Sequence, residues 1–167
     1  MRIALLFLVL AAPALAQPAA PCDSTATAGL AFWIGTWDLE LDTQAGPATG
    51  TNTITRDHLD CVVRERFQAA AGYAGESVSV RTPAGWRQTW VDNSGGYLTF
   101  TGETDTEGRV IAMHQPPFTN PQGQTQHNRM IWEDITHNGF TWRWQASTDN
   151  RATWTDSWVI RYSRAEG

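Results

Sequence analysis

The feature that most constrains the fold is a succession of short segments in which apolar and polar residues alternate, with turn residues roughly every 8–12 positions. Trp37, Leu39 and Leu41, for example, alternate with three acidic residues, as in a strand that has one buried face and one solvent-facing side. The 3.6-residue period of an amphipathic helix is nearly absent; only residues 24–34 could hold a short helix, with Thr27 as its cap. The chain is therefore predicted to be all-β.

Turn residues divide the chain from Gly35 onward into about ten such segments, and consecutive segments can all be joined by hairpins. The alternation centres on residues 37–42, 49–55, 61–67, 78–80, 86–91, 97–101, 109–113, 128–132, 140–146 and 154–162. A meander of about ten twisted strands closes on itself and so removes its exposed edges. We expect an antiparallel up-and-down barrel, closed or nearly closed, with an open sandwich as the alternative.

One stretch interrupts this rhythm. Residues 115–126 contain three prolines and a glycine and show no alternation, which predicts a long loop. Long loops in compact domains are often functional.

Composition excludes several functions. The chain has 17 acidic residues, 12 arginines, no lysine and a net charge of −5, whereas a protein that binds nucleic acid by neutralising phosphates would be basic. Nine tryptophans in 167 residues also exclude a disordered chain. About 150 residues suit one domain with a real core, which we expect over residues 32–164, preceded by an arm over residues 17–31.

Residues 1–16 have the layout of a secretory signal peptide. A single positive charge at Arg2 precedes an apolar run and an Ala-Leu-Ala cleavage motif, which ends just before Gln17. The run is shorter than the ~20 residues that span a bilayer, so a retained membrane anchor is the weaker interpretation. Pro21, which precedes Cys22, argues against lipoprotein processing. We expect a periplasmic or secreted protein with no membrane span after cleavage.

Export bears on the two cysteines, Cys22 and Cys61. An even pair in an oxidising compartment favours a disulfide, which would tie the N-terminal arm to a strand near Cys61. Closing a loop of about 40 residues corresponds to roughly 4 kcal/mol in the chain-entropy model. The alternative is two separate thiols. A metal site at this pair is not expected, because there is no C-x-x-C spacing.

Several motifs resemble a known group of barrels. The segment Phe-Trp-Ile-Gly-Thr-Trp-Asp at residues 32–38 resembles the G-x-W signature of lipocalin-like (calycin) barrels, in which the glycine allows a tight bend and the tryptophan plugs the closed end. More broadly, the chain is similar to a family of exported bacterial proteins of unknown function with a lipocalin-like barrel. The further matching segments are Cys61-Val62-Val63-x-Glu65, Gly85-Trp86-x-Gln88-x-Trp90-Val91-Asp92, Arg129-x-x-Trp132, Ser147-x-Asp149, Thr153-Trp154 and Tyr162-x-Arg164.

The resemblance implies a barrel large enough for a ligand but no activity. A related ten-stranded barrel, nitrobindin, holds haem through a histidine. No histidine of this chain can be matched to that ligand, so no cofactor is expected, and haem is only a minor alternative.

Glu65 is the first candidate for a functional group. It shares a strand face with Cys61, Val63 and Phe67, which predicts that its carboxyl group points inward, where it must be paired or neutralised. Arg129, near the middle of another strand, is the candidate partner. With Gln88, these residues could orient the polar end of a ligand. The alternatives are a buried ion pair that fixes strand register, or residues on a solvated face.

The tryptophans form pairs at strand spacing: Trp86 with Trp90, Trp142 with Trp144, and Trp154 with Trp158. Aromatic side chains dominate packed cores, but stacked indoles in a wide barrel also suit a flat or sugar-like ligand. The predicted ligand-binding residues are Glu65, Trp86, Gln88, Trp90, Arg129, Trp142 and Trp144.

Other chemistries have weaker support. Asp156 lies between Trp154 and Trp158 and would be a second inward carboxylate if that face is internal, so that Glu65 and Asp156 could act as an acid/base pair. His114 and His127 flank the long loop without metal-binding spacing, and we expect no metal there. The nucleophile-elbow, phosphate-loop and dinucleotide motifs are absent.

The sequence thus predicts a barrel that binds a small, partly apolar or aromatic molecule. The alternatives are a small hydrolase or isomerase that uses inward carboxylates, and a filled barrel that interacts through residues 115–126. It predicts no nucleic-acid partner and indicates no oligomeric state.

Overall fold

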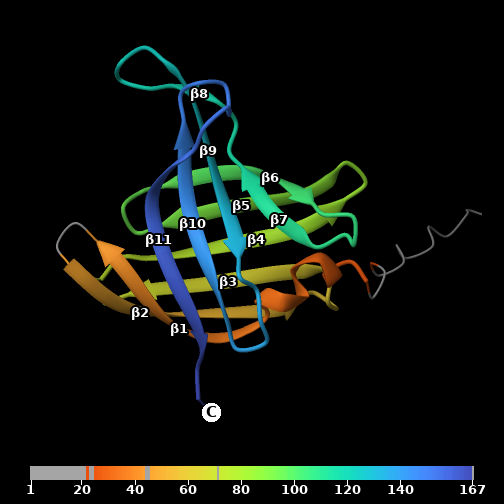
Figure 1. The fold of residues 1–167 in the computed structure, drawn as a ribbon. Helices are drawn as coiled ribbons and strands as arrows, with labels where there is room; N and C mark the ends of the chain where they lie inside the picture. Colours follow the sequence, from red (N-terminus) through yellow and green to blue (C-terminus); the bar gives the residue numbers. More distant parts are fainter. Residues whose placement is uncertain (1–21, 23–24, 44–45, 71, 167) are drawn as a thin grey trace, which may run out of the picture.

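Ten antiparallel strands follow one another around a closed barrel in the described part of the chain, which comprises residues 22, 25–43, 46–70 and 72–166 of this computed structural model (Figure 1). The strands are β1 (Gly35–Thr43), β2 (Gly46–Asp57), β3 (Val62–Ala69), β4 (Ala74–Thr82), β5 (Gly85–Asp92), β6 (Tyr97–Thr104), β7 (Val110–His114), β9 (Thr125–Glu133), β10 (Gly139–Ser147) and β11 (Thr155–Arg164). The predicted signal peptide, residues 1–16, lies outside the described residues.

Each barrel strand pairs with its neighbour in the chain, except that β7 pairs with β9. The ring is closed by β1, which pairs with β11. The all-β, up-and-down barrel predicted from the alternation is therefore confirmed, and the open sandwich is excluded. No helix within the described ranges is long and apolar enough to cross a membrane.

The predicted long loop is an ordered extension of the sheet. A two-residue strand, β8 (Phe118–Thr119), pairs with the beginning of β9 and stands beyond the barrel rim (Figure 1). The side-chain oxygen of Asn120 accepts hydrogen bonds from the backbone N–H groups of Gln122 and Gln124 and so holds the turn.

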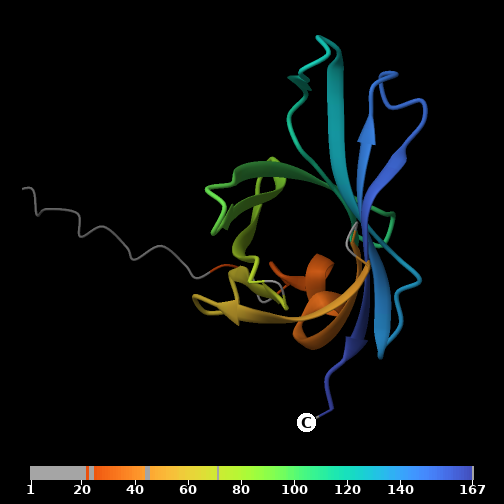
Figure 2. The same ribbon diagram turned by 90° about the vertical axis from the view of Figure 1, so that its left-hand side faces the viewer.

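One end of the barrel is closed by a short 3₁₀ helix, η1 (Ala28–Trp33), which lies inside the ring of strands (Figure 2). Its Leu30 and Trp33 are fully buried. The sequence predicts that Thr27 caps this helix, but its hydroxyl group makes no capping hydrogen bond. The hydroxyl oxygen accepts a hydrogen bond from the Nε of Arg56 instead. The end that η1 covers is called the closed end below.

Trp37 fills the space beside η1. Its indole N–H donates to the carbonyl oxygen of Trp33 at 2.8 Å, and the Arg164 guanidinium lies 4.2 Å above its ring. Gly35 has a φ of +144°, and a Cβ there would lie 2.4 Å from the Arg164 guanidinium, so the first strand can begin this way only with glycine. The Gly-x-Trp motif therefore seals the closed end.

The predicted disulfide joins Cys22 to Cys61 and is confirmed. It ties the arm in front of η1 to the turn between β2 and β3. Because η1 fills the closed end, the disulfide also limits how far η1 can move out of the barrel.

Candidate functional site

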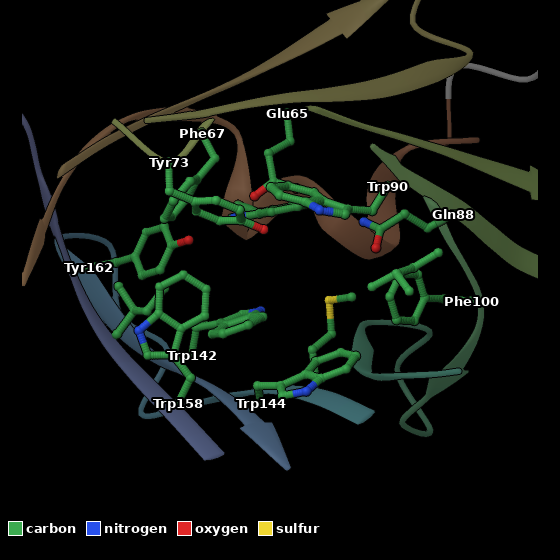
Figure 3. Close-up of a pocket in the computed structure, with 14 residues that line it drawn as sticks. Glu65, Phe67, Tyr73, Gln88, Trp90, Phe100, Trp142, Trp144, Trp158 and Tyr162 are labelled. Carbon is green, nitrogen blue, oxygen red and sulfur yellow. The ribbon is translucent and has the colours of Figure 1, made fainter. Parts of the chain in front are cut away.

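The half of the barrel away from the closed end contains a cavity of about 220 Å³ (Figure 3). Its lining is mostly aromatic, with a few polar groups. The lining residues are Trp33, Glu65, Phe67, Tyr73, Gln88, Trp90, Leu98, Phe100, Met130, Trp142, Trp144, Trp158, Ile160 and Tyr162. The interior is thus not completely filled, which removes the main premise of the filled-barrel interpretation.

Strand alternation places most of these side chains. Trp142 and Trp144 lie two residues apart on β10, so both indoles enter the lumen from the same face. Trp90 reaches the cavity from β5 and lies against the backbone of β4, where a Cβ on Gly75 would come within 2.2 Å of the indole ring. Gly75 is therefore required for Trp90 to adopt this position.

The aromatic rings contact one another around the cavity. Trp142 and Trp144 are stacked with ring centroids 6.4 Å apart, and Trp158 meets Trp142 edge to face at 5.7 Å. Phe67 lies between Trp158 and Trp90, at 5.8 and 6.2 Å. These contacts hold the rings in place while Trp90, Trp142, Trp144 and Trp158 remain only partly buried. The cavity therefore presents ordered π faces to a ligand.

Asp92 fixes two of the aromatic groups. Its carboxylate accepts hydrogen bonds from the Trp90 indole N–H at 2.9 Å and from the Tyr73 hydroxyl at 3.1 Å. The Ser94 hydroxyl, the Trp90 indole and the Gly96 backbone N–H hold the pKa of Asp92 well below its usual range. Burial and the Asp92 carboxylate raise the pKa of Tyr73 to about 12. Asp92 is therefore negatively charged at neutral pH, and its carboxylate orients Trp90 and Tyr73.

Glu65 is the acidic residue of the cavity, and its side chain is only 7% exposed. It accepts hydrogen bonds from the Ser77 hydroxyl at 2.6 Å and from the Asn52 amide at 2.7 Å. Asn52 also donates to the Tyr162 hydroxyl oxygen at 3.0 Å. Burial raises the pKa of Glu65 to about 7, although both hydrogen bonds favour the charged form. The inward orientation predicted for Glu65 is thus what the structure shows, but its partners are neutral.

Two polar groups of the cavity lack hydrogen-bond partners in the described part of the chain. The Gln88 amide N–H donates to Ser79 at 2.9 Å and to Ser77 at 3.3 Å, while its carbonyl oxygen has no hydrogen-bond partner among the described residues. The Trp33 indole N–H is likewise unpartnered in the described ranges. An unsatisfied buried polar group costs about 1–3 kcal/mol, so a ligand that donates a hydrogen bond to the Gln88 carbonyl oxygen recovers part of that free energy.

The structure contradicts the proposed pairing of Glu65 with Arg129. Arg129 alternates on β9 with Met130, which lines the cavity, so Arg129 points to the outside of the barrel. Its Nε donates to Gln145 at 2.8 Å, and its guanidinium lies 4.0 Å above the Trp154 ring. Alternation alone did not reveal which face of this strand is internal.

Asp156 also lies outside, for a different reason. A β-bulge shifts the register between β10 and β11, so that Trp158 pairs with Trp144 while Asp156 pairs with Gln145. The extra residue moves Asp156 to the outer face, where it binds Arg143 at 2.5 Å and Gln145 at 2.8 Å. The acid/base pair considered for Glu65 and Asp156 is therefore wrong.

Trp86, His114 and His127 also lie away from the cavity. Trp86 is buried at the closed end, where it contacts Gly29 of η1. The His114 imidazole pairs with Glu103 at 2.8 Å, and His127 accepts a hydrogen bond from Arg151 at 3.2 Å. In the part of the chain that the structure describes, no cluster of three or more His, Cys, Asp or Glu side chains could hold a metal ion.

Of the predicted ligand-binding residues, Glu65, Gln88, Trp90, Trp142 and Trp144 line one cavity. The sequence reasoning missed Tyr73, Asp92, Tyr162 and Asn52. Asp92 left a usable signal, since it directly precedes the turn Asn-Ser-Gly-Gly, where an aspartate commonly accepts backbone N–H groups.

No family model and no curated protein matches this chain. Among solved structures, the chain is similar to a fluorescence-activating β-barrel that was designed de novo. The sequence identity is 13% and the TM-score 0.41, over 86% of this chain and 100% of the designed chain. Membership in an exported bacterial family stays a prediction.

Proposed function

We propose that the barrel binds a small, mainly aromatic or apolar molecule in the cavity, with the polar end of the molecule directed toward Glu65 and Gln88. The observation that carries this proposal is the lining itself, in which ordered indole faces surround the Glu65 carboxyl group and the Gln88 amide, whose carbonyl oxygen has no partner among the described residues. Ligand sites commonly combine apolar walls with a few placed polar groups. A cavity of about 220 Å³ exceeds the ~150 Å³ engineered cavity that accepts benzene, so one or two rings fit.

Binding is better supported than catalysis. Among the described residues, Glu65 is the one carboxylate in the lining, and the second acid that the enzyme hypothesis required points away from it. A hydrolase or isomerase that used paired inward carboxylates would lack one of its two catalytic carboxylates. Because residues 1–16 have the layout of a signal peptide, the proposal places this binding protein in the periplasm or outside the cell.

Titration with 2-phenylethanol tests the proposal. Calorimetry and tryptophan fluorescence should both report saturable binding to one site. Replacing Trp144 with alanine removes one ring of the lining and should weaken binding by about tenfold, as loss of an aromatic contact and its buried area implies. Arg129→Ala is the matched control, because Arg129 points outward, and it should leave the affinity unchanged within about twofold.

Two outcomes would contradict the proposal. One is the absence of any heat or fluorescence change at millimolar 2-phenylethanol. The other is equal weakening by Trp144→Ala and Arg129→Ala, which would place the bound molecule outside the barrel.

A further inference from the structure

The cavity contains a buried carboxylate, that of Glu65, whose negative charge is not compensated by a positively charged partner among the described residues. Both hydrogen bonds that the structure gives to Glu65 come from the neutral groups of Asn52 and Ser77. Within the described ranges, Glu65 forms no ion pair, and neither an arginine nor a histidine lines the cavity. Buried acids are normally paired with a cation, because an isolated charge is costly to desolvate.

The aromatic lining supplies a second, independent preference for positive charge. Figure 3 shows Glu65 entering the lumen from one side, with Trp142 and Trp144 on the opposite side. Trp90 and Trp158 also line this space. The face of an indole is electron-rich and attracts cations, most strongly when the cation is removed from water. Several indoles around one carboxylate thus complement a positively charged group.

We infer that the ligand is an organic ammonium, which is a protonated amine attached to a small aromatic or apolar body. This inference rests on the proposed binding function. The ammonium group lies near the Glu65 carboxylate, where its N–H groups donate to that carboxylate and to the free carbonyl oxygen of Gln88. The apolar body contacts the indoles. A neutral ligand of the same size would leave the carboxylate either protonated or uncompensated.

The groups that face Glu65 predict how this binding depends on pH. They are Asn52 on β2, Ser77 on β4, Tyr162 on β11 and Tyr73 just before β4. Burial and the charge of Glu65 raise the pKa of Tyr162 well above its ordinary value, and the pKa of Tyr73 is also raised, so both phenols stay neutral. Glu65, with its pKa raised by burial to about 7, changes charge in the neutral range. Affinity for an ammonium ligand should therefore rise with pH as Glu65 ionises.

Three probes with the same phenyl group but different charges test the inference by calorimetry: 2-phenylethylamine, 2-phenylethanol and 3-phenylpropanoate. At about pH 8 the protonated amine should bind at least about tenfold more tightly than the alcohol, and the carboxylate should not bind. Lowering the pH to about 5.5 should weaken amine binding by at least about tenfold and leave alcohol binding unchanged.

Glu65→Gln keeps the size of the side chain and removes its charge. This variant should bind amine and alcohol within about twofold of each other and lose the pH dependence. Glu103→Gln is the matched control, because Glu103 pairs with His114 and removal of its charge should leave the preference for the amine intact. A far-ultraviolet circular dichroism spectrum like that of the wild type and a cooperative unfolding transition show that a variant is folded.

The outcomes separate the inference from the function on which it rests. If the alcohol binds and the amine binds no more tightly, or if the preference survives Glu65→Gln, the ammonium assignment is wrong while the binding function stands. If neither probe binds, the binding function itself is wrong. If Glu65→Gln fails to fold, the pH dependence of amine binding to the wild-type protein tests the inference instead. An amine affinity that does not change with pH would overturn it.

Discussion

Replacing Trp37 with alanine is expected to lower the free energy of unfolding by about 3–5 kcal/mol, the range typical of a buried tryptophan replaced by alanine. Trp37 is 0% exposed. Its ring meets Phe140 edge to face at 4.9 Å and Tyr162 at 6.3 Å, and its N–H donates to Trp33. The substitution leaves a void at the closed end and an unpaired carbonyl oxygen on η1, and neither can be repaired by a small shift, because η1 is enclosed by the strands.

Denaturant unfolding followed by circular dichroism measures this loss. Tyr97→Ala serves as the control, because Tyr97 is 70% exposed and its removal should change stability by less than about 0.5 kcal/mol. A loss of under about 1.5 kcal/mol for Trp37→Ala would show that Trp37 and η1 do not form the packed closed end described above.

The second large effect concerns Glu65 and pH. Its pKa in the folded protein is raised by burial to about 7, from an ordinary value of 4.5. Below pH 4.5 the carboxyl group is protonated in both the folded and the unfolded chain. Between these two pKa values the unfolded chain releases the proton while the folded chain retains it, so rising pH favours unfolding. Above about pH 7 no further stability is lost. The integrated loss is about 3 kcal/mol.

Comparison with Glu65→Gln isolates this effect, because the amide cannot ionise. The wild-type protein should lose about 3 kcal/mol of stability relative to the variant between about pH 4 and pH 8, measured as unfolding free energies at several pH values. The same series for Glu103→Gln should show no such trend, since Glu103 is exposed. A stability difference between wild type and Glu65→Gln that stays constant, or that grows in favour of the wild type with rising pH, would contradict the burial of an unpaired carboxyl group.

Local alternation was sufficient to predict the barrel, because each strand contacts its neighbour in the chain and the side-chain period is a property of the strand itself. The same reasoning placed Glu65 inward, since apolar neighbours at even spacing identified the buried face of its strand. The disulfide likewise followed from an even pair of cysteines in a chain predicted to be exported.

What alternation could not predict depends on contacts between distant parts of the chain. A bulge on β11 reverses the orientation of Asp156, and nothing near Asp156 in the sequence announces it. Asn52 lies in a threonine-rich strand that looks solvated, yet it is fully buried because Glu65 and Tyr162 come from other strands to meet its amide. Arg129 has polar and apolar neighbours on both faces, so its own strand does not show which face is internal.

The nine indole N–H resonances in a nitrogen–proton correlation spectrum test the central claim most directly, because each tryptophan reports separately on the bound molecule. On addition of 2-phenylethanol, the largest shifts should occur at the tryptophans that line the cavity. These are Trp33, Trp90, Trp142, Trp144 and Trp158. The remaining indoles should move little; they are Trp37, Trp86, Trp132 and Trp154. Saturation without shifts in the first group, or with the largest shift at the outward-facing Trp154, would contradict binding inside the barrel.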